Sequence, residues 1–123
     1  MENDKEKFKK EFKARLYVLT LRIVRFVDAM PRGMVSEVMG KQLLRSGTSV
    51  LANYIEAQSA SSKKDFTNFF THSLKSANES KVWITLLRDT NKVSKSDAEA
   101  LLSALSEAAR VIASSILTLK GKK

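Results

Sequence analysis

The sequence contains no cysteine, one histidine and one proline. Without cysteine the chain forms no disulfide and offers no thiolate to a metal, and this absence suits a reducing compartment. One histidine cannot supply the two Glu-x-x-His units of a di-iron carboxylate bundle. With one proline and four glycines, few residues interrupt long helices. The composition therefore favours a few long helices over many short strands.

Long apolar runs are also missing. The longest uncharged run, residues 46–55, is far too short to cross a bilayer. The charged first residues lead into no apolar run, so we expect no secretory signal. A basic amphipathic first helix could lie on a membrane surface, but a bundle core would already use its apolar stripe. We expect a soluble cytoplasmic protein without membrane contact, and a single domain over residues 1–123.

Four apolar stripes run through the chain, with spacings that alternate between four and three residues. Such residues lie on one side of an α-helix. They predict helices over about residues 4–29, 35–58, 63–90 and 95–119. The stripes are Phe12, Leu16, Leu19, Ile23, Phe26 and Met30; Met39, Leu43, Ser46, Val50, Asn53 and Ala57; Phe66, Phe70, Ser73, Ala77, Ser80, Ile84 and Leu87; and Ala98, Leu101, Leu105, Ala108, Ile112, Ser115 and Leu119. Because the connections are short, the predicted fold is all-α, an antiparallel up-down-up-down four-helix bundle.

The helix over residues 35–58 is nearly free of charge between Gln42 and Ala57, so we expect it at the centre of the bundle. Asn53 interrupts its buried stripe and needs hydrogen-bond partners there. Glu56 and Glu79 project from the two middle helices. They could form a catalytic carboxylate pair, but we interpret them as structural residues that accept hydrogen bonds from neighbouring helices or subunits.

Basic residues outnumber acidic ones by 22 to 13, which gives a net charge of +9 and favours anionic partners, nucleic acid first. Six residues of the first helix are the candidate nucleic-acid contacts: Arg15, Arg22, Arg25, Lys9, Lys10 and Lys13. The alternative is that these charges only keep the surface soluble. Nearly opposite the apolar stripe of this helix, Tyr17, Leu21 and Val24 form a second apolar seam, which predicts a homo-oligomer.

Residue patterns that carry catalysis are absent. His72 has no triad context around it, and we expect it on a helix surface. No glycine-rich phosphate loop is present. We therefore expect no catalytic residues, no metal, no cofactor and no enzymatic activity, and we rank RNA cleavage behind the two binding hypotheses given below.

The pattern over residues 42–79 resembles the small bacterial four-helix proteins encoded in intervening sequences of large-subunit ribosomal RNA genes. The residues that match the pattern of this family are Gln42, Leu43, Arg45, Ser46, Ser49, Asn53, Glu56, Asp65, Phe66, Ser76 and Glu79. Ala57 and Lys75 depart from it, since the family has glycine at both positions. The resemblance implies a ring-shaped homo-oligomer, commonly a pentamer. It also implies kinship to the accessory proteins of diversity-generating retroelements, which bind nucleic acid and a reverse transcriptase.

Two functions follow as hypotheses. The first is a non-enzymatic oligomeric protein that binds RNA or DNA through its basic surface, as an accessory factor in RNA processing or retroelement function, with a reverse transcriptase as a protein partner. The second is a structural scaffold for a protein partner, with no role in nucleic-acid binding. The first is our leading hypothesis, and the second is its main alternative.

Overall fold

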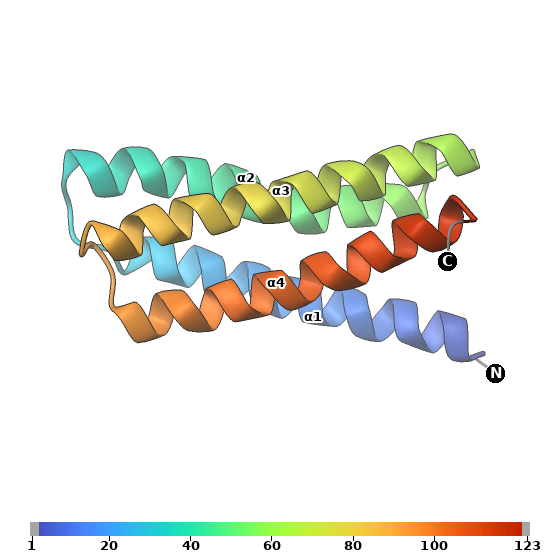
Figure 1. Ribbon diagram of the computed structural model, residues 1–123, viewed down its shortest axis with the longest axis horizontal. Helices are drawn as coiled ribbons and strands as arrows, with labels where there is room; N and C mark the ends of the chain where they lie inside the picture. The colour runs from blue at the N-terminus through green and yellow to red at the C-terminus, as the bar shows by residue number, and fades with distance from the viewer. Residues whose placement is uncertain (1–2, 122–123) are drawn as a thin grey trace.

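The computed structural model describes residues 3–121, and these residues form four helices and no strand. The helices are α1 (Asp4–Asp28), α2 (Met34–Gln58), α3 (Lys63–Asp89) and α4 (Lys95–Leu119). Their bounds lie within one residue of the expected ones. The α1–α2 and α3–α4 connections lie at one end of the molecule, whereas the α2–α3 connection and both termini lie at the other (Figure 1). The chain therefore turns back at each connection, and the all-α four-helix prediction is confirmed.

The helix ends follow from local chemistry. Asn3, Ser62 and Ser94 cap α1, α3 and α4, because each side chain accepts a hydrogen bond from the backbone N–H three residues later, at 2.8, 3.1 and 3.2 Å. Asn91, just beyond α3, has a φ of 60°. Asparagine tolerates this left-handed conformation, which is common directly after a helix. These ends account for the agreement between expected and observed helix bounds.

The core contains most of the predicted stripes, with one correction on α2. The buried residues of α2 are Ser36, Gly40, Leu43, Ser46, Gly47, Val50, Tyr54 and Ala57. Tyr54 is only 3% exposed, whereas its neighbour Asn53, predicted to be buried, is half-buried. Helix α2 also has an outer side, on which Val38 and Ile55 are exposed. Four of the six residues of the expected stripe, Leu43, Ser46, Val50 and Ala57, are therefore buried as predicted, and Gly40 and Tyr54 take the places expected of Met39 and Asn53.

Small side chains let α2 and α3 pack closely. Ser46, Ser73 and Ser80 are completely buried, as is Ala77. The hydroxyls of Ser46 and Ser80 lie 2.8 Å apart and form a hydrogen bond across the interface. The Ser73 hydroxyl donates to the backbone carbonyl of Val50 at 2.7 Å. Since side-chain size sets the distance between helix axes, these residues bring the two backbones together, and their hydroxyls remain hydrogen-bonded.

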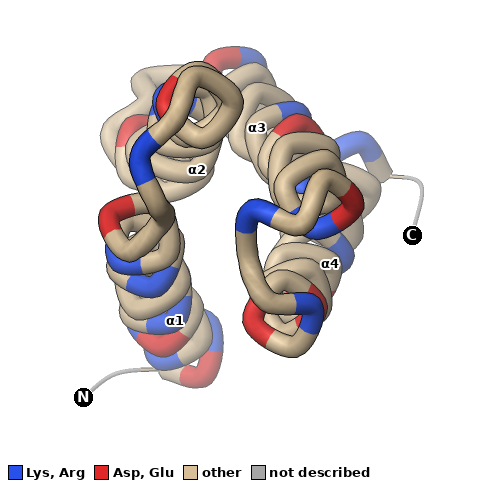
Figure 2. The backbone as a smooth tube through the Cα atoms, turned by 90° about the vertical axis from the view of Figure 1, so that its left-hand side faces the viewer, with Lys and Arg blue, Asp and Glu red and all other residues tan. Residues whose placement is uncertain are grey.

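Glycine allows α1 to approach α2. A Cβ atom added to Gly47 would lie 2.9 Å from Cγ2 of Ile23, and one added to Gly40 would lie 3.0 Å from the Met30 side chain. Helices α1 and α4 approach each other least of the neighbouring pairs (Figure 2). The bundle is therefore closed tightly on three sides and more loosely between α1 and α4.

Among the described residues, α4 is the one helix that is long and apolar enough to cross a membrane, judged by length and composition. The core helix of a soluble protein passes the same test. In α4, Leu101, Leu105 and Ile112 are buried against the other helices. The packing of α4 in the core thus accounts for part of its apolar character.

Candidate nucleic-acid interface

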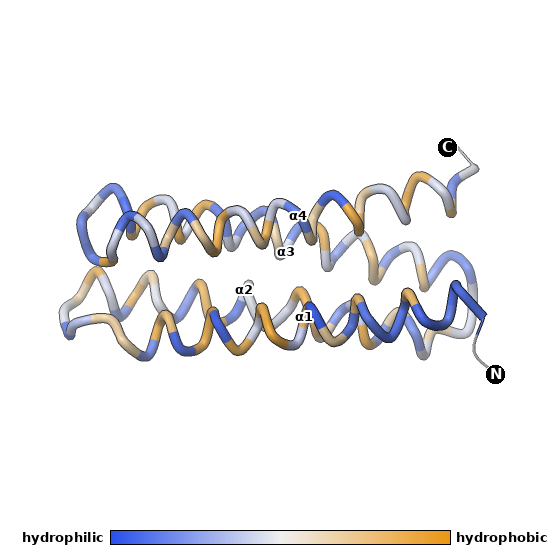
Figure 3. The backbone as a smooth tube through the Cα atoms, turned by 90° about the horizontal axis from the view of Figure 1, so that it is seen from below, coloured by the Kyte–Doolittle hydropathy of each residue, from blue (hydrophilic) through white to orange (hydrophobic). Residues whose placement is uncertain are grey.

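Helix α1 carries eight basic and four acidic side chains. Its basic side chains are exposed, except that of Lys9, which is half-buried. They recur along the helix (Figure 2) and make its first turns hydrophilic (Figure 3). The predicted cationic surface is therefore accessible to a partner along most of α1.

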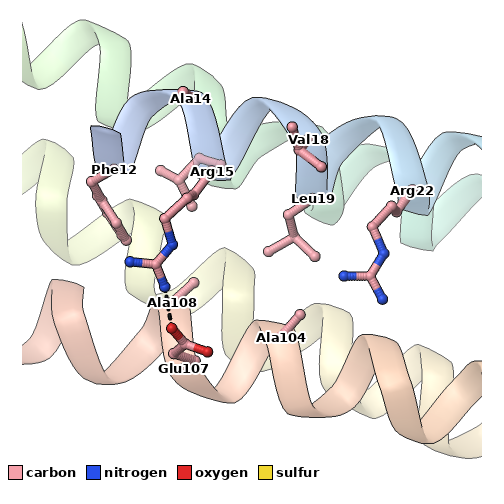
Figure 4. Close-up of a pocket in the computed structure, with 10 residues that line it drawn as sticks. Phe12, Ala14, Arg15, Val18, Leu19, Arg22, Ala104, Glu107 and Ala108 are labelled. Atoms are coloured by element: carbon pink, nitrogen blue, oxygen red, sulfur yellow. Dashed lines mark hydrogen bonds and ion pairs between the residues drawn. The ribbon is translucent and has the colours of Figure 1, made fainter. Parts of the chain in front are cut away.

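A groove of about 400 Å³ runs between α1 and α4. Apolar side chains of both helices line it, including Leu19 of α1 and Ala104 and Ala108 of α4. The side chains of Arg15 and Arg22 both extend from α1 toward α4 along this groove (Figure 4). The loose α1–α4 contact thus forms an apolar surface next to two cations.

Arg15 is not a free cation, contrary to the simplest interpretation of the sequence. Its guanidinium forms an ion pair with the Glu107 carboxylate on α4 (Figure 4). The Arg15 Cζ atom also lies 5.8 Å from the centre of the Phe12 ring, within the range of a cation–π interaction. Both side chains of the ion pair are more than half exposed, so the pair itself adds little stability. Arg15 therefore contributes to the contact between α1 and α4 as well as to the basic surface.

The remaining candidates differ in position. Within residues 3–121, Lys13, Arg22 and Arg25 have exposed side chains with no ion-pair or hydrogen-bond partner. Lys10 is exposed and has an interaction of its own. Lys9 lies near the start of α1 and lines a separate pocket at the end of the bundle. Three of the six predicted residues thus combine an exposed side chain with the lack of a partner within the described residues.

The two structural residues expected on α2 have smaller roles than predicted. The Asn53 side chain donates to the Ser49 carbonyl of its own helix at 2.9 Å and binds no neighbouring helix. Among the described residues, the exposed Glu56 side chain has no hydrogen-bond or ion-pair partner. The partner of Asn53 therefore lies on its own helix and not across the buried stripe, whereas the prediction that Glu56 accepts hydrogen bonds from another subunit stays a prediction. Tyr54 takes the buried position that was expected of Asn53.

Glu79 is the centre of a polar network across α2 and α3, as expected of a structural residue. Its carboxylate forms an ion pair with Arg45, and its Oε2 atom accepts a hydrogen bond from Trp83 Nε1 at 2.9 Å. Arg45 also donates to Oε1 of Gln42, from Nε at 3.1 Å and from Nη2 at 2.9 Å. Gln42, Arg45 and Glu79 belong to the pattern that carries the family resemblance. In this fold they connect the two closely packed helices on their outer side.

The network changes the acidity of Glu79. The hydrogen bond from Trp83 lowers the pKa of this carboxyl most, and the Arg45 hydrogen bond and charge lower it further. Partial burial opposes the shift. Because the folded-state pKa lies below the ordinary carboxyl value, the network stabilises the fold above that value and loses its contribution as the pH falls through the lowered one. Glu79 thus has a structural role at neutral pH, where it is ionised.

The sequence analysis did not identify three residues: Glu107 of the α1–α4 groove, Trp83 of the Glu79 network, and Phe8 of the pocket at the end of the bundle. Glu107 lies 92 positions from Arg15, and no local pattern connects them. Trp83 follows Glu79 by four residues, a spacing that places two side chains together on a helix. Phe8 precedes Phe12 by four residues and would have extended the first stripe by one turn. The last two residues could have been identified from their spacing.

No group of three His, Asp or Glu side chains that could hold a metal ion occurs within residues 3–121. His72 is exposed on α3, as predicted. The site contains cations on one helix, an apolar groove beside them and a polar network on the opposite pair of helices. Such an arrangement offers charge and surface for binding.

Comparisons with known proteins agree with this fold. The family model described as 23S rRNA-intervening sequence protein matches residues 9–114. A crystal structure from Bacteroides thetaiotaomicron, described as a protein with unknown function from the S23 ribosomal protein family, is similar with 33% sequence identity and a TM-score of 0.78. The match covers 85% of this chain and 97% of the other. No curated protein matches the sequence. The chain therefore belongs to the family of 23S rRNA-intervening sequence proteins.

Proposed function

We propose that this chain is a non-enzymatic, oligomeric protein that binds RNA or DNA through the basic surface of α1. The observation that supports this most is the uncompensated charge of Lys13, Arg22 and Arg25, which have no partner within the described chain. Exposed cations that a protein does not pair internally are available to phosphates. The name of the family supports a role related to rRNA, and we propose that the chain acts in the cytoplasm as an accessory factor in RNA processing. A more specific version of this proposal is that the chain is an accessory factor of a retroelement and binds its reverse transcriptase.

An exposed apolar surface supports assembly into a homo-oligomer. Tyr17 and Val24 on α1 are 57% and 38% exposed, so the second seam faces outward as predicted. On α2, Leu44 lines a hollow shared with the end of α1, and Leu51 and Ile55 follow it on the same side. These residues of α1 and α2 offer a second copy one apolar surface across two helices. A ring, with the pentamer as its most favoured size, would repeat the α1 cations around an axis and add weak phosphate contacts together.

Assembly gives the first testable prediction. We expect the purified chain to sediment as an oligomer at micromolar concentration. A Tyr17→Glu, Ile55→Glu variant should dissociate, because two carboxylates per subunit would have to be desolvated at the contact. The matched control is Val82→Glu on α3, which also replaces an exposed apolar residue, one 54% exposed. If the parent protein is a stable monomer, or if the control dissociates equally, this surface is not the subunit contact.

A salt titration tests nucleic-acid binding directly. We expect the parent protein to bind generic RNA, with the logarithm of the association constant falling linearly as the logarithm of salt concentration rises. The affinity should depend little on sequence, since phosphate contacts carry no sequence information. Fluorescence anisotropy over a series of salt concentrations measures both properties. If no binding is seen at low salt, the second hypothesis, a scaffold for a protein partner, replaces this one.

A further inference from the structure

We infer that a pocket at the end of the bundle holds an unstacked base of single-stranded RNA or DNA, an inference that rests on the proposed nucleic-acid binding and specifies its form. The pocket has a volume of about 270 Å³ and lies where the first turns of α1 and α3 meet the last turns of α4. In Figure 1 this is the end of the molecule that carries both termini. None of the α1–α4 groove residues described above lines it.

Aromatic side chains form much of the pocket. Phe8 of α1 and Phe66 of α3 both line it, and the nearly buried Phe70 is also part of its wall. Phe8 is 49% exposed, although its ring stacks on Phe12 at 6.1 Å with an angle of 7° between the planes. Phe66 and Phe70 form an edge-to-face pair at 4.7 Å. An exposed ring held in place by a second ring offers a face on which a planar base can stack.

Lysines surround this aromatic pocket. Lys5 and Lys9 line it from α1. An adjoining open hollow of about 510 Å³, which shares Leu119 with the pocket, is lined by Lys63, Lys64 and Lys120. These five lysines have no ion-pair partner within residues 3–121. Asp4, Glu6 and Asp65 are the acidic residues in the same turns of α1 and α3, so positive charge prevails at this end.

The arrangement of charge favours a polyanion over a small amphipathic anion. A fatty acid would need one or two lysines at the mouth of the pocket, but here the lysines continue past the pocket into the adjoining hollow. A nucleic-acid strand fits both features, because its bases stack on aromatic rings while its phosphates follow a line of cations. A duplex keeps its bases stacked and paired, so only a single strand can place one in the pocket.

The test compares single-stranded and duplex oligonucleotides on the parent protein and on two variants of Phe8. Phe8→Leu keeps an apolar side chain but removes the ring face, and it should weaken single-strand binding by between about 5-fold and about 150-fold while duplex binding stays unchanged. Phe8→Trp should retain single-strand binding. A bound strand should quench the fluorescence of this added indole more than the fluorescence of Trp83, the single tryptophan of the parent. Val38→Ala, at an exposed apolar site on α2, is the control for the loss of surface area.

The lysines provide an independent measurement. A Lys63→Gln, Lys64→Gln variant should weaken single-strand binding more than a Lys41→Gln, Lys75→Gln variant, which removes the same charge at exposed sites elsewhere. If the parent binds nucleic acid but Phe8→Leu changes nothing, the pocket inference is overturned and the proposed function stands. If the parent binds neither form, both are overturned. Binding of a fatty acid in the absence of any oligonucleotide binding would assign the pocket to an amphipathic anion.

Discussion

Replacing Ala77 with leucine should destabilise the protein by about 3 kcal/mol, at the upper end of the cost of overfilling a packed core. Ala77 is completely buried on α3, between Ser73 and Ser80 on the same side of the helix. Ser73 is hydrogen-bonded to the backbone of α2, and Ser80 to a side chain of α2. A leucine would force the two helices apart and break both hydrogen bonds, so the cost includes these bonds as well as strain.

Thermal unfolding followed by circular dichroism measures this effect, with an expected fall of roughly 10 °C in the melting temperature. The control is Ala100→Leu, the same chemical change at an exposed position of α4. Alanine and leucine both favour helices, so the control should melt within about 2 °C of the parent. If Ala77→Leu melts at the temperature of the parent, α2 and α3 are not held as closely as their small residues indicate.

Most of the fold could be predicted because its determinants are local. The alternation of four and three residues identifies the four helices, and Asn3, Ser62 and Ser94 mark three of their starts through side-chain caps. Asn91 marks the end of α3 in the same way. Each of these signals acts within about one helical turn, so reading it requires no knowledge of the neighbouring helices.

The error on α2 arose where local signals were ambiguous. Two stripes that share Leu43, Val50 and Ala57 fit this helix, and they differ in that one passes through Met39 and Asn53 and the other through Gly40 and Tyr54. The contact with α1 decides between them, because Gly40 and Gly47 are the residues that let Val27 and Ile23 pack close to α2. A hydrophobic pattern does not show which neighbouring helix must approach closely. The sequence therefore could not show whether Asn53 or Tyr54 is the buried residue.

The candidate site shows the same division. The cations of α1 were predicted, since charge is visible in composition and exposure follows from the helix period. The ion pair between Arg15 and Glu107 was not, because it depends on how α1 and α4 meet. The aromatic pocket at the end of the bundle was missed for the same reason: its walls come from three helices. The packing of α1 against α4 therefore pairs Arg15, whereas other cations of α1 remain available for binding.

Because Arg15 is paired with Glu107, the variant with the largest expected effect on function changes the unpaired cations of α1 and leaves Arg15 in place. Changing Lys13, Arg22 and Arg25 to glutamine removes three exposed cations and keeps the Arg15–Glu107 ion pair. If each cation neutralises one phosphate, the slope of the salt titration should fall by about one unit for each cation removed. At about 0.1 M salt, removing all three cations should weaken RNA binding by roughly a hundredfold or more.

The control must remove the same charge elsewhere, because a lower net charge alone weakens attraction to any polyanion. Lys41, Lys75 and Arg110 are exposed on α2, α3 and α4, and changing these three residues to glutamine lowers the net charge from +9 to +6, as in the α1 variant. We expect this control to retain most of the salt slope. Equal reductions of affinity in the two variants would mean that overall charge attracts the nucleic acid without a defined surface.

If the α1 variant, assembled as the parent is, binds RNA with unchanged affinity and slope, then α1 does not contact nucleic acid. The cations of α1 would then serve solubility, and the scaffold hypothesis would account better for the exposed apolar residues beside them.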